Sequence, residues 1–376
     1  MKSMQLCVIG IAALVVAAAV IVYVVTDNGP GPEGPGSLSD AAGNEISLSV
    51  NVQTITAASP SIADIVCYMG YGSNIVAVST SCTHPDIPSG TTTVGPYTNP
   101  NTDGISTANA DVTFIDGSNM NAVTAYNTLR SAGMNVVMMY GSRDTIDGVY
   151  KNVEIVGRIM RSEHYQEIIG EMRATVAMLK AATNGAPHTR ILVTTGLASL
   201  ATDTGGNFTN LAAFTGAGVY VAGIDSAINS MISEVSRMTT PASGSGWAAA
   251  DTDFLSTSTG NVDLLIVLWT NKASMPNATA INDLLTKMKG TGSPWANCKA
   301  VKDGNIVFIG GDAGSDLSRV TPYTVYKGLS LMSLYVNPGC YSATPGGAAR
   351  SLGDLPQCVD NSNLAALTAY TENRPA

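Results

Sequence analysis

Residues that usually carry catalytic or metal-binding chemistry are scarce in this sequence of 376 residues. The only histidines are His84, His164 and His188, and no Cys-x-x-Cys or His-Glu-x-x-His pattern is present to hold zinc. The Gly-x-Ser-x-Gly turn of serine hydrolases and the Gly-x-x-x-x-Gly-Lys loop that binds phosphates are also missing. We therefore predict that the protein is not an enzyme and has no metal site built by its own residues.

Polar and aromatic side chains near the ends of predicted strands could instead bind a ligand. In open α/β sheets, ligands lie beyond the carboxyl ends of the strands. The preferred candidates, which include one tryptophan beside a loop rich in Gly and Ser, are Ser59, Ser61, Tyr97, Asp116, Tyr140, Arg143, Trp247, Trp269 and Asp312. Other residues that follow strands are Ser81, His84, Asn119, Thr195, Asn271 and Ser315. The pattern indicates a binding site.

Arg143 is the strongest of these candidates. It is the only basic residue between Arg130 and Lys151, and it follows a predicted strand. Its guanidinium could hold an anionic ligand group through two parallel hydrogen bonds. The alternative is a solvated charge that pairs with an aspartate of the same loop, Asp144 or Asp147.

The other candidates also have structural alternatives. Ser59 and Ser61 flank a proline and could simply cap the next helix. Tyr140 could anchor the end of its strand, and Trp269 could fill the core instead of offering a flat face to a ligand. Tyr97 lies in a segment rich in turns and could pack on the surface.

Short apolar stretches alternate with helical patterns along most of the chain. The predicted strands are 52–57, 75–78, 112–115, 136–140, 191–195, 219–221, 262–268 and 306–309. The predicted helices include 146–160, 207–214, 227–238, 277–288 and 323–335. Strands that are separated by helices pair in parallel and carry the helices on the faces of the sheet.

One predicted helix is longer than the others. Ser162 is a suitable N-cap, apolar residues recur on one face as far as Leu179, and Asn184-Gly185 ends the helix. The chain is thereby divided into an α/β lobe at 46–161, a connecting helix at 162–184 and a second α/β lobe at 185–338. We expect two Rossmann-like lobes with mainly parallel sheets, joined by a single long α-helix.

Several segments occur in an order that is typical of one family. They are Ala58-Ser-Pro-Ser-Ile-Ala-Asp-Ile-Val66, Met69-Gly-Tyr-Gly-Ser-Asn-Ile-Val-Ala-Val-Ser79, Val94-Gly-Pro-Tyr-Thr-Asn-Pro-Asn101, Asn261-Val-Asp-Leu-Leu-Ile-Val267 and Ala300-Val-Lys-Asp-Gly-Asn-Ile-Val-Phe-Ile309. With them the chain resembles the substrate-binding proteins of ABC importers for iron-siderophores, haem and cobalamin. The resemblance covers residues 46–338.

This resemblance implies a ligand and partners. The ligand would be an iron chelate, haem or corrinoid held between the lobes, with the metal carried only inside the ligand and no further cofactor. The partners would be an ABC permease and its ATPase, met through one acidic residue on each lobe. The expected glutamate after Pro100-Asn101 is absent, so Asp103 and, in the second lobe, Glu234 are the docking candidates.

The N-terminus predicts a membrane anchor. Residues 6–25 contain no charge, and as a helix they would extend roughly 30 Å, enough to cross a bilayer. No small-residue cleavage site follows them. We expect segment 1–25 to be an uncleaved single-pass anchor with the bulk of the chain outside the cell, and the Gly/Pro-rich segment 26–45 to be a linker.

The tail at 339–376 lies outside the resemblance. Its two cysteines, Cys340 and Cys358, predict a disulfide, which would stabilise the tail by about 3 kcal/mol. Cys67 and Cys82 could form a second pair or remain buried thiols, and Cys298 is left over.

The charge of the chain excludes binding to nucleic acid. There are 19 basic and 28 acidic residues, a net charge of -9, whereas a protein that binds phosphate backbones needs an excess of Lys and Arg. A membrane-tethered receptor is the leading hypothesis. The alternatives are a surface or sensory ectodomain that keeps the binding fold without transport and, third, an extracellular hydrolase.

Overall fold

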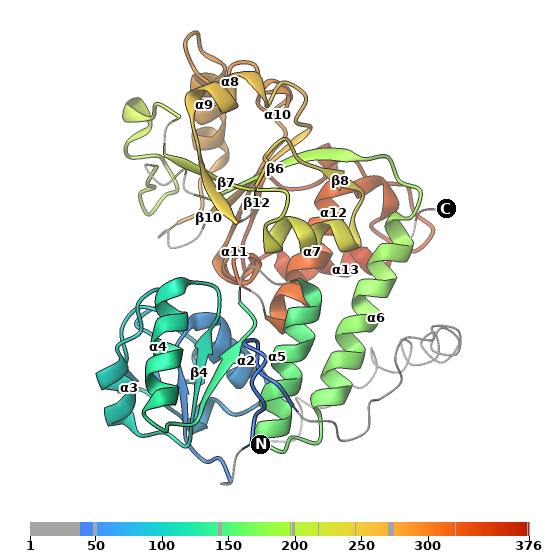
Figure 1. Cartoon of the computed structure of the whole chain (residues 1–376). Helices are drawn as coiled ribbons and strands as arrows, with labels where there is room; N and C mark the ends of the chain where they lie inside the picture. The colour runs from blue at the N-terminus through green and yellow to red at the C-terminus, as the bar shows by residue number, and fades with distance from the viewer. Residues whose placement is uncertain are drawn as a thin grey trace.

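The computed structural model describes residues 38–47, 51–141, 145–195, 197, 200–216, 218–244, 246–269, 274–319, 321–373 and 375. It has two α/β lobes, the N-terminal one below and the C-terminal one above in Figure 1. The long helix α6 (Tyr165–Thr183) runs along one side of both lobes and joins them. The predicted α/β class with parallel sheets is confirmed.

The N-terminal lobe is built on a fully parallel sheet in the order β3-β2-β1-β4-β5. Its strands are β1 (Ile55–Ala57), β2 (Ile75–Val78), β3 (Thr92–Thr93), β4 (Val112–Asp116) and β5 (Val136–Met139). Its helices are α2 (Pro60–Tyr68), α3 (Thr102–Ala108), α4 (Met120–Ser131) and α5 (Ile146–Ile159). β1 lies in the middle of this sheet, with β2 and β3 on one side of it and β4 and β5 on the other. The loops that follow β1 and β4 therefore lead in opposite directions and leave room for a ligand between them.

The C-terminal lobe contains a larger sheet in the order β12-β11-β10-β6-β7-β9, with β8 beside β6. The strands are β6 (Thr189–Thr195), β7 (Val219–Ala222), β8 (Met238–Thr239), β9 (Trp247–Ala250), β10 (Leu264–Trp269), β11 (Ile306–Gly310) and β12 (Cys358–Val359). β7 runs antiparallel to both β6 and β9, and the other described pairings are parallel.

Helices cover both faces of this second sheet. They are α7 (Ala227–Val235), α8 (Thr252–Thr257), α9 (Ala278–Lys289), α10 (Lys299–Asp303), α11 (Gly311–Leu317), the π-helix η3 (Thr324–Gly328), α12 (Leu329–Val336) and α13 (Leu364–Ala369). The helix predicted at 207–214 is wrong, because only the 3₁₀ turn Leu211–Ala213 forms there. The carboxylate of Asp203 accepts hydrogen bonds from the backbone N–H groups of Gly205 and Asn207, and such local bonds compete with a helix.

The lobes are joined through a continuous apolar core. α5 and α6 pack closely at Gly157, where an added Cβ would lie 2.3 Å from the Cβ of Tyr165. Met172 and Leu179 on α6 are fully buried. They belong to one hydrophobic cluster that extends from β1 through α5 and α6 to α7 and α12. The connection is therefore packed on both lobes along its length.

The end of the predicted linker belongs to the N-terminal lobe. Asp40 is 2% exposed and accepts hydrogen bonds from the hydroxyl of Tyr126 at 2.6 Å and from the backbone N–H of Met138 at 3.2 Å. The predicted anchor at 1–25 and the rest of the linker lie outside the described residues. Within the described part of the chain, no helix is both long and apolar enough to span a bilayer.

The tail is part of the C-terminal lobe. It adds β12 to the edge of the sheet beside β11, and α13 packs on α12. The predicted Cys340–Cys358 disulfide is not formed, and this prediction is corrected: the thiol of Cys358 donates to the carbonyl of Pro276 at 3.0 Å. The two cysteines pack against different hydrophobic clusters, because β12 draws Cys358 into the sheet.

Candidate functional site

A pocket of about 230 Å³ lies between the two lobes. Its lining comes from loops after strands of the N-terminal lobe, from α7, from the start of β9 and from the segment that ends α11. The lining residues are Tyr97, Thr98, Ser118, Asn119, Ser226, Ala227, Ile228, Met231, Gly246, Trp247, Leu317, Ser318 and Arg319. This is where the open ends of the two sheets face each other.

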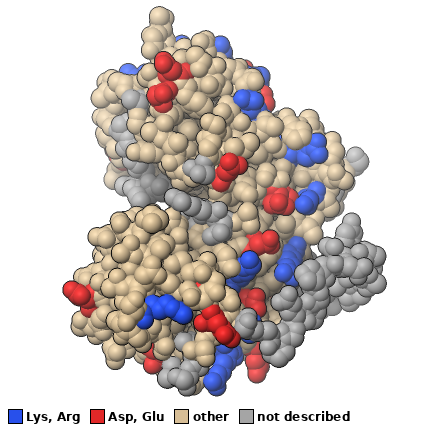
Figure 2. All heavy atoms as spheres, viewed as in Figure 1, with Lys and Arg blue, Asp and Glu red and all other residues tan. Residues whose placement is uncertain are grey.

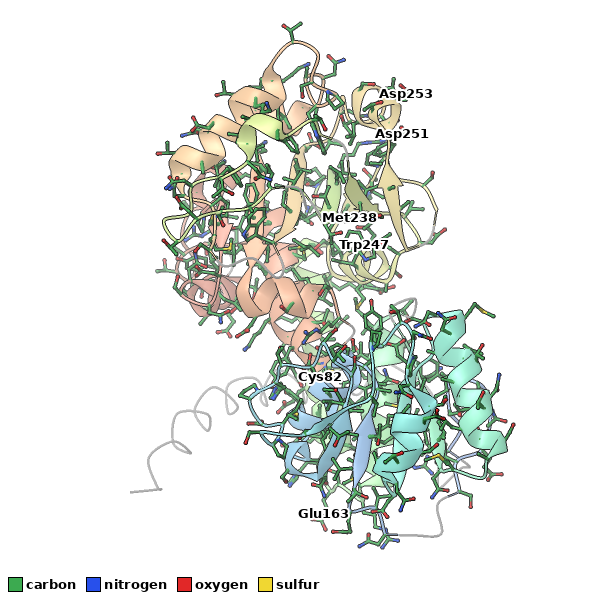
Figure 3. The ribbon with its side chains drawn as sticks, turned by 90° about the vertical axis from the view of Figure 1, so that its left-hand side faces the viewer. Cys82, Glu163, Met238, Trp247, Asp251 and Asp253 are labelled. Carbon is green, nitrogen blue, oxygen red and sulfur yellow. The ribbon has the colours of Figure 1, made fainter. Side chains whose placement is uncertain are left out.

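Two aromatic side chains meet the pocket from opposite lobes. Tyr97 follows β3 and is 39% exposed, and Trp247 begins β9 and is 37% exposed. Figure 3 shows Trp247 on the side of the C-terminal lobe that faces the N-terminal lobe. The loop of Tyr97 is held by the side-chain amide of Asn119, which donates to the Tyr97 carbonyl at 3.4 Å. The pair offers flat apolar faces to a ligand.

Two helices begin at the pocket. The side chain of Asn119 caps α4 by accepting from the N–H of Ala122 at 2.9 Å. The side chain of Ser226 caps α7 by accepting from the N–H of Asn229 at 3.3 Å. Helix N-termini carry a partial positive charge. The positive ends of both helices therefore lie at the cleft.

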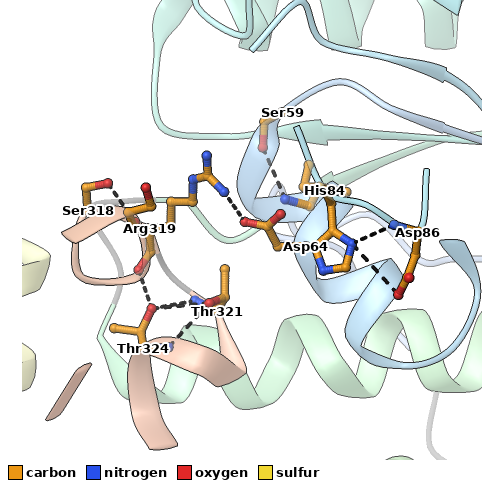
Figure 4. Close-up of polar contacts among 10 residues, drawn as sticks. Ser59, Asp64, His84, Asp86, Ser318, Arg319, Thr321 and Thr324 are labelled. Carbon is orange, nitrogen blue, oxygen red and sulfur yellow. Dashed lines mark hydrogen bonds and ion pairs between the residues drawn. The ribbon is translucent and has the colours of Figure 1, made fainter. Parts of the chain in front are cut away.

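Arg319 connects the lobes beside the pocket. Its Nη1 donates to the carboxylate of Asp64 on α2, as Figure 4 shows. The side chain of Asp64 is 7% exposed and that of Arg319 is 23% exposed. Burial raises the pKa of the Asp64 carboxyl, while the charge and hydrogen bond of Arg319 act in the opposite direction. This ion pair ties the end of α11 to the N-terminal lobe.

His84 lies near the same ion pair. Its Nδ1 is 3.8 Å from the carboxylate of Asp86, and it accepts from the backbone N–H of Asp86 at 3.2 Å, also drawn in Figure 4. Its ring stacks beside Tyr323 with centroids 6.5 Å apart. These contacts place His84 at the lobe junction and not in the lining of the pocket.

Of the predicted site residues, the structure brings Tyr97 and Trp247 to the pocket, together with Asn119. Ser59 is 1% exposed, and its hydroxyl caps α2 by accepting from the N–H of Ile62. Its role is therefore that of a helix cap, the alternative to ligand binding. Ser61 is half-buried on the first turn of α2, outside the lining.

Asp116 ends β4 and Tyr140 follows β5, and both make contacts within the N-terminal lobe. The Asp116 carboxylate accepts from the N–H of Ser118 at 2.8 Å and is 6% exposed. Both backbone groups of Tyr140 bond the side-chain amide of Asn152, at 2.9 and 2.8 Å. The nitrogen of Lys151 lies 4.8 Å from the centre of the Tyr140 ring. Neither residue lines the pocket.

The prediction that Trp269 and Asp312 face the ligand is corrected by the structure. Trp269 is 3% exposed and sits in the core between Phe208 and Phe308, because β10 is a central strand covered on both faces. Asp312 bonds Asn361 and lines a second cavity of about 470 Å³, which is formed by α6, η3 and the tail instead of the cleft.

Arg143 lies outside the described residues. Sequence reasoning missed Arg319, although the same signal was available: it is the only basic residue between Lys302 and Lys327, and it follows β11. The remaining missed residues, such as Ser226 and Ser318, are common surface types whose position only the fold reveals.

The docking candidates both lie on the surface. Asp103 is exposed in the first turn of α3, whose cap is Asn101. Glu234 is exposed on α7 and pairs with Lys180 of α6 at 3.3 Å, which orients it toward the connecting helix. Among the residues that Figure 2 colours, most of the charged side chains lie on the right, toward α6 and α12. The described residues contain no group of His, Cys, Asp and Glu that could hold a metal ion.

Comparison with known proteins identifies relatives. The family described as periplasmic binding protein matches residues 55–313. No protein with a curated description matches the sequence. A periplasmic haem-binding protein from Pseudomonas aeruginosa is 17% identical, with 76% of this chain and 93% of that chain covered and a TM-score of 0.55.

Two further solved structures have the same fold. The periplasmic vitamin B12-binding protein BtuF of Vibrio cholerae is 14% identical, with 76% and 97% coverage of the two chains and a TM-score of 0.56. CeuE of Helicobacter pylori, solved with nickel and histidine, is 13% identical, with 81% and 89% coverage and a TM-score of 0.60. At this level of identity, the likeness establishes the arrangement of the two lobes and leaves the ligand open.

Proposed function

Since this chain belongs to the periplasmic binding protein family, we propose that it is the substrate-binding component of an ABC importer. In this proposal it captures an iron chelate, haem or corrinoid in the cleft and delivers it to a permease. Segment 1–25 tethers it to the membrane with the lobes outside the cell. Any metal enters only as part of the ligand, and the protein performs no chemistry on it.

The observation that carries the proposal is the pair of exposed aromatic residues in the cleft. Large apolar side chains on a soluble protein are usually covered, and exposed ones that gather in a cleft indicate a ligand surface. Tyr97 and Trp247 come from different lobes and line the same pocket. A flat ligand between them would contact both lobes at once.

The size of the pocket is consistent with a ligand that is only partly enclosed. Its volume of about 230 Å³ lies below the roughly 300–1,000 Å³ typical of pockets that bury a whole small molecule. A macrocycle would therefore extend from the pocket toward the mouth of the cleft. Relatives that bind haem and vitamin B12 have the same two-lobe fold.

Tryptophan fluorescence tests the proposal directly. Trp247 is the exposed tryptophan, whereas Trp269 and Trp295 are 3% and 0% exposed. Titration with haemin, cyanocobalamin and a ferric siderophore should quench the Trp247 emission for the ligand class that binds. The buried tryptophans also transfer energy to a bound chromophore, so the Trp247→Phe variant should keep part of the quenching and lose the share that comes from Trp247.

A matched pair of tyrosine variants separates the cleft from the general surface. Tyr97→Ala should weaken binding about fivefold, by the loss of a stacking face worth about 1 kcal/mol. Tyr220→Ala removes an exposed tyrosine that does not line the pocket and should leave affinity unchanged. Saturable binding of none of the three ligands would contradict the transport function as stated.

Delivery to a permease is tested separately. We propose Asp103 as the acidic contact of the N-terminal lobe and Glu234 as that of the C-terminal lobe. If the carboxylates dock on arginines, Asp103→Asn and Glu234→Gln should each reduce the stimulation of the importer's ATPase without changing ligand affinity. An unchanged ATPase response in both variants would remove these two residues from the docking surface.

A further inference from the structure

The described lining of the cleft pocket contains one charged residue. It is Arg319, which follows α11 and whose side chain is 23% exposed. The rest of the described lining is aromatic, aliphatic or neutral and polar, without a carboxylate. A partly buried guanidinium is stabilised by an anion more strongly than one in water.

The position of Arg319 is fixed from two directions. Its backbone carbonyl accepts a hydrogen bond from Oγ1 of Thr324 at 2.5 Å, which anchors the segment to η3 (Figure 4). Its Nη1 binds the carboxylate of Asp64, which α2 holds in the N-terminal lobe. An arginine has five N–H donors, and this contact engages Nη1. The guanidinium is thus oriented by a buried partner while part of it stays accessible to the pocket.

The helix ends at the pocket act in the same direction. α4 and α7 both begin there, at the caps Asn119 and Ser226. Their positive ends add to the charge of Arg319, so the cleft favours a negatively charged group on the ligand.

We propose that Arg319 recognises a free carboxylate of the ligand and that Asp64 positions it for this contact. The inference rests on the proposed function and narrows its ligand class to a flat apolar body that carries at least one carboxylate, as a porphyrin with propionate groups does. The aromatic faces of Tyr97 and Trp247 take the ring, and the planar fork of Arg319 takes the carboxylate. A macrocycle whose acid groups are all amidated would lose this contact.

A pair of ligands that differ only in their carboxylates tests the inference. Haemin and its dimethyl ester are titrated into the full chain by tryptophan quenching, for the wild type and for Arg319→Gln. We expect Arg319→Gln to weaken haemin binding about tenfold to a hundredfold and to leave the affinity for the ester within about twofold. For each ligand, the affinity of the variant is divided by that of the wild type. If detergent is used to dissolve the porphyrins, its uptake of ligand affects both proteins equally and cancels in this ratio.

Three variants serve as controls. Lys327→Gln removes one positive charge at the second cavity and should change neither affinity. Arg319→Lys keeps the charge without the fork and should recover part of the haemin affinity. Asp64→Asn should reduce the preference for haemin over the ester while the ester still binds, and Asp64→Glu should restore that preference. If Asp64 contributed to stability alone, Asp64→Asn would lower the affinities for haemin and for the ester by the same factor.

The outcomes distinguish this inference from the proposed function. Equal weakening of haemin and ester in Arg319→Gln overturns the carboxylate contact and leaves the cleft receptor in place. Binding of cyanocobalamin in preference to haemin also overturns the carboxylate contact. If the wild type binds neither porphyrin nor corrinoid nor siderophore, the proposed function fails and this inference fails with it.

Discussion

At the scale of single residues, the ion pair between Asp64 and Arg319 sets two electrostatic effects against each other. Burial disfavours the charged carboxylate, and the guanidinium favours it. Burial is the larger effect, so the pKa of Asp64 is raised above its ordinary value near 3.8. The other charged groups that act on Asp64 are His84, which lowers its pKa, and Asp312, which raises it.

This shift predicts a pH dependence of stability. A carboxyl with a raised pKa in the folded protein binds its proton more tightly than in the unfolded chain, so its contribution to stability is largest at low pH. The free energy of unfolding of the wild type, relative to Asp64→Asn, should fall as pH rises from about 3.8 through the raised pKa. Urea unfolding of both proteins between pH 4 and 7 measures this. A relative stability that rises over the same window would mean that Arg319 outweighs burial.

The cysteines near this pair give a second prediction. Burial raises the pKa of the thiols of Cys67 and Cys82 to about 12. Only the thiolate reacts with iodoacetamide, so both should be alkylated slowly in the native protein at pH 8 and quickly in denaturant. Mass spectrometry of peptides from timed reactions checks this. Native rates as fast as the denatured ones would contradict the buried, protonated state of these thiols.

At the scale of elements, Asn277 shows how one side chain joins a loop to a helix. Its Oδ1 caps α9 by accepting from the N–H of Ala280 at 2.8 Å. Its Nδ2 donates to the carbonyl of Gly205 at 3.0 Å and to Oδ1 of Asn207 at 2.8 Å. The loop that replaces the predicted helix at 207–214 is therefore attached to the start of α9.

Substitution of Asn277 separates these two roles. Asn277→Ala removes the cap and the loop contacts and should lower the free energy of unfolding by about 2 kcal/mol, whereas Asn277→Asp keeps the capping oxygen and should cost about half as much. Urea denaturation compares them. Equal stability of Asn277→Ala and the wild type would show that neither contact contributes.

Asn277-Ala-Thr279 is also a glycosylation sequon, and a glycan on Nδ2 would displace both loop contacts.

At the scale of the whole molecule, the two lobes behave as one packed unit. The hydrophobic cluster that includes Met172 and Leu179 continues from one lobe to the other. The hydroxyl of Tyr326 on η3 also donates to the carbonyl of Ile168 on α6 at 3.1 Å. Rotating the lobes apart would break the continuous core, which costs more than a hinge in a flexible linker.

Ligand binding should therefore change the shape of the molecule only slightly. We expect free and loaded crystal structures to superpose over both lobes with a Cα deviation of about 1 Å or less. Small-angle scattering with and without ligand gives an independent measure in solution. A large rotation of one lobe on the other would contradict the packing argument.

The sequence by itself determined the main strands, the connecting helix and two residues of the candidate pocket. β2 was predicted at 75–78 and forms there, and the long connecting helix predicted at 162–184 corresponds to α6. Local patterns suffice here, because a buried strand or an amphipathic helix requires a periodicity that its own residues supply. The rule that ligands lie at strand ends placed Tyr97 near the cleft, and the Gly/Ser-rich loop before Trp247 brought that residue into the set.

Only the tertiary structure decided which of the candidates face the ligand. Trp269 ends a strand like the others, but β10 is covered on both faces and turns the indole into the core. The contact between Arg319 and Asp64 joins residues 255 positions apart, and no local pattern contains it. The sequence gives the chemical type of each side chain. Which residues that side chain contacts depends on how strands and helices that are distant in the sequence pack together.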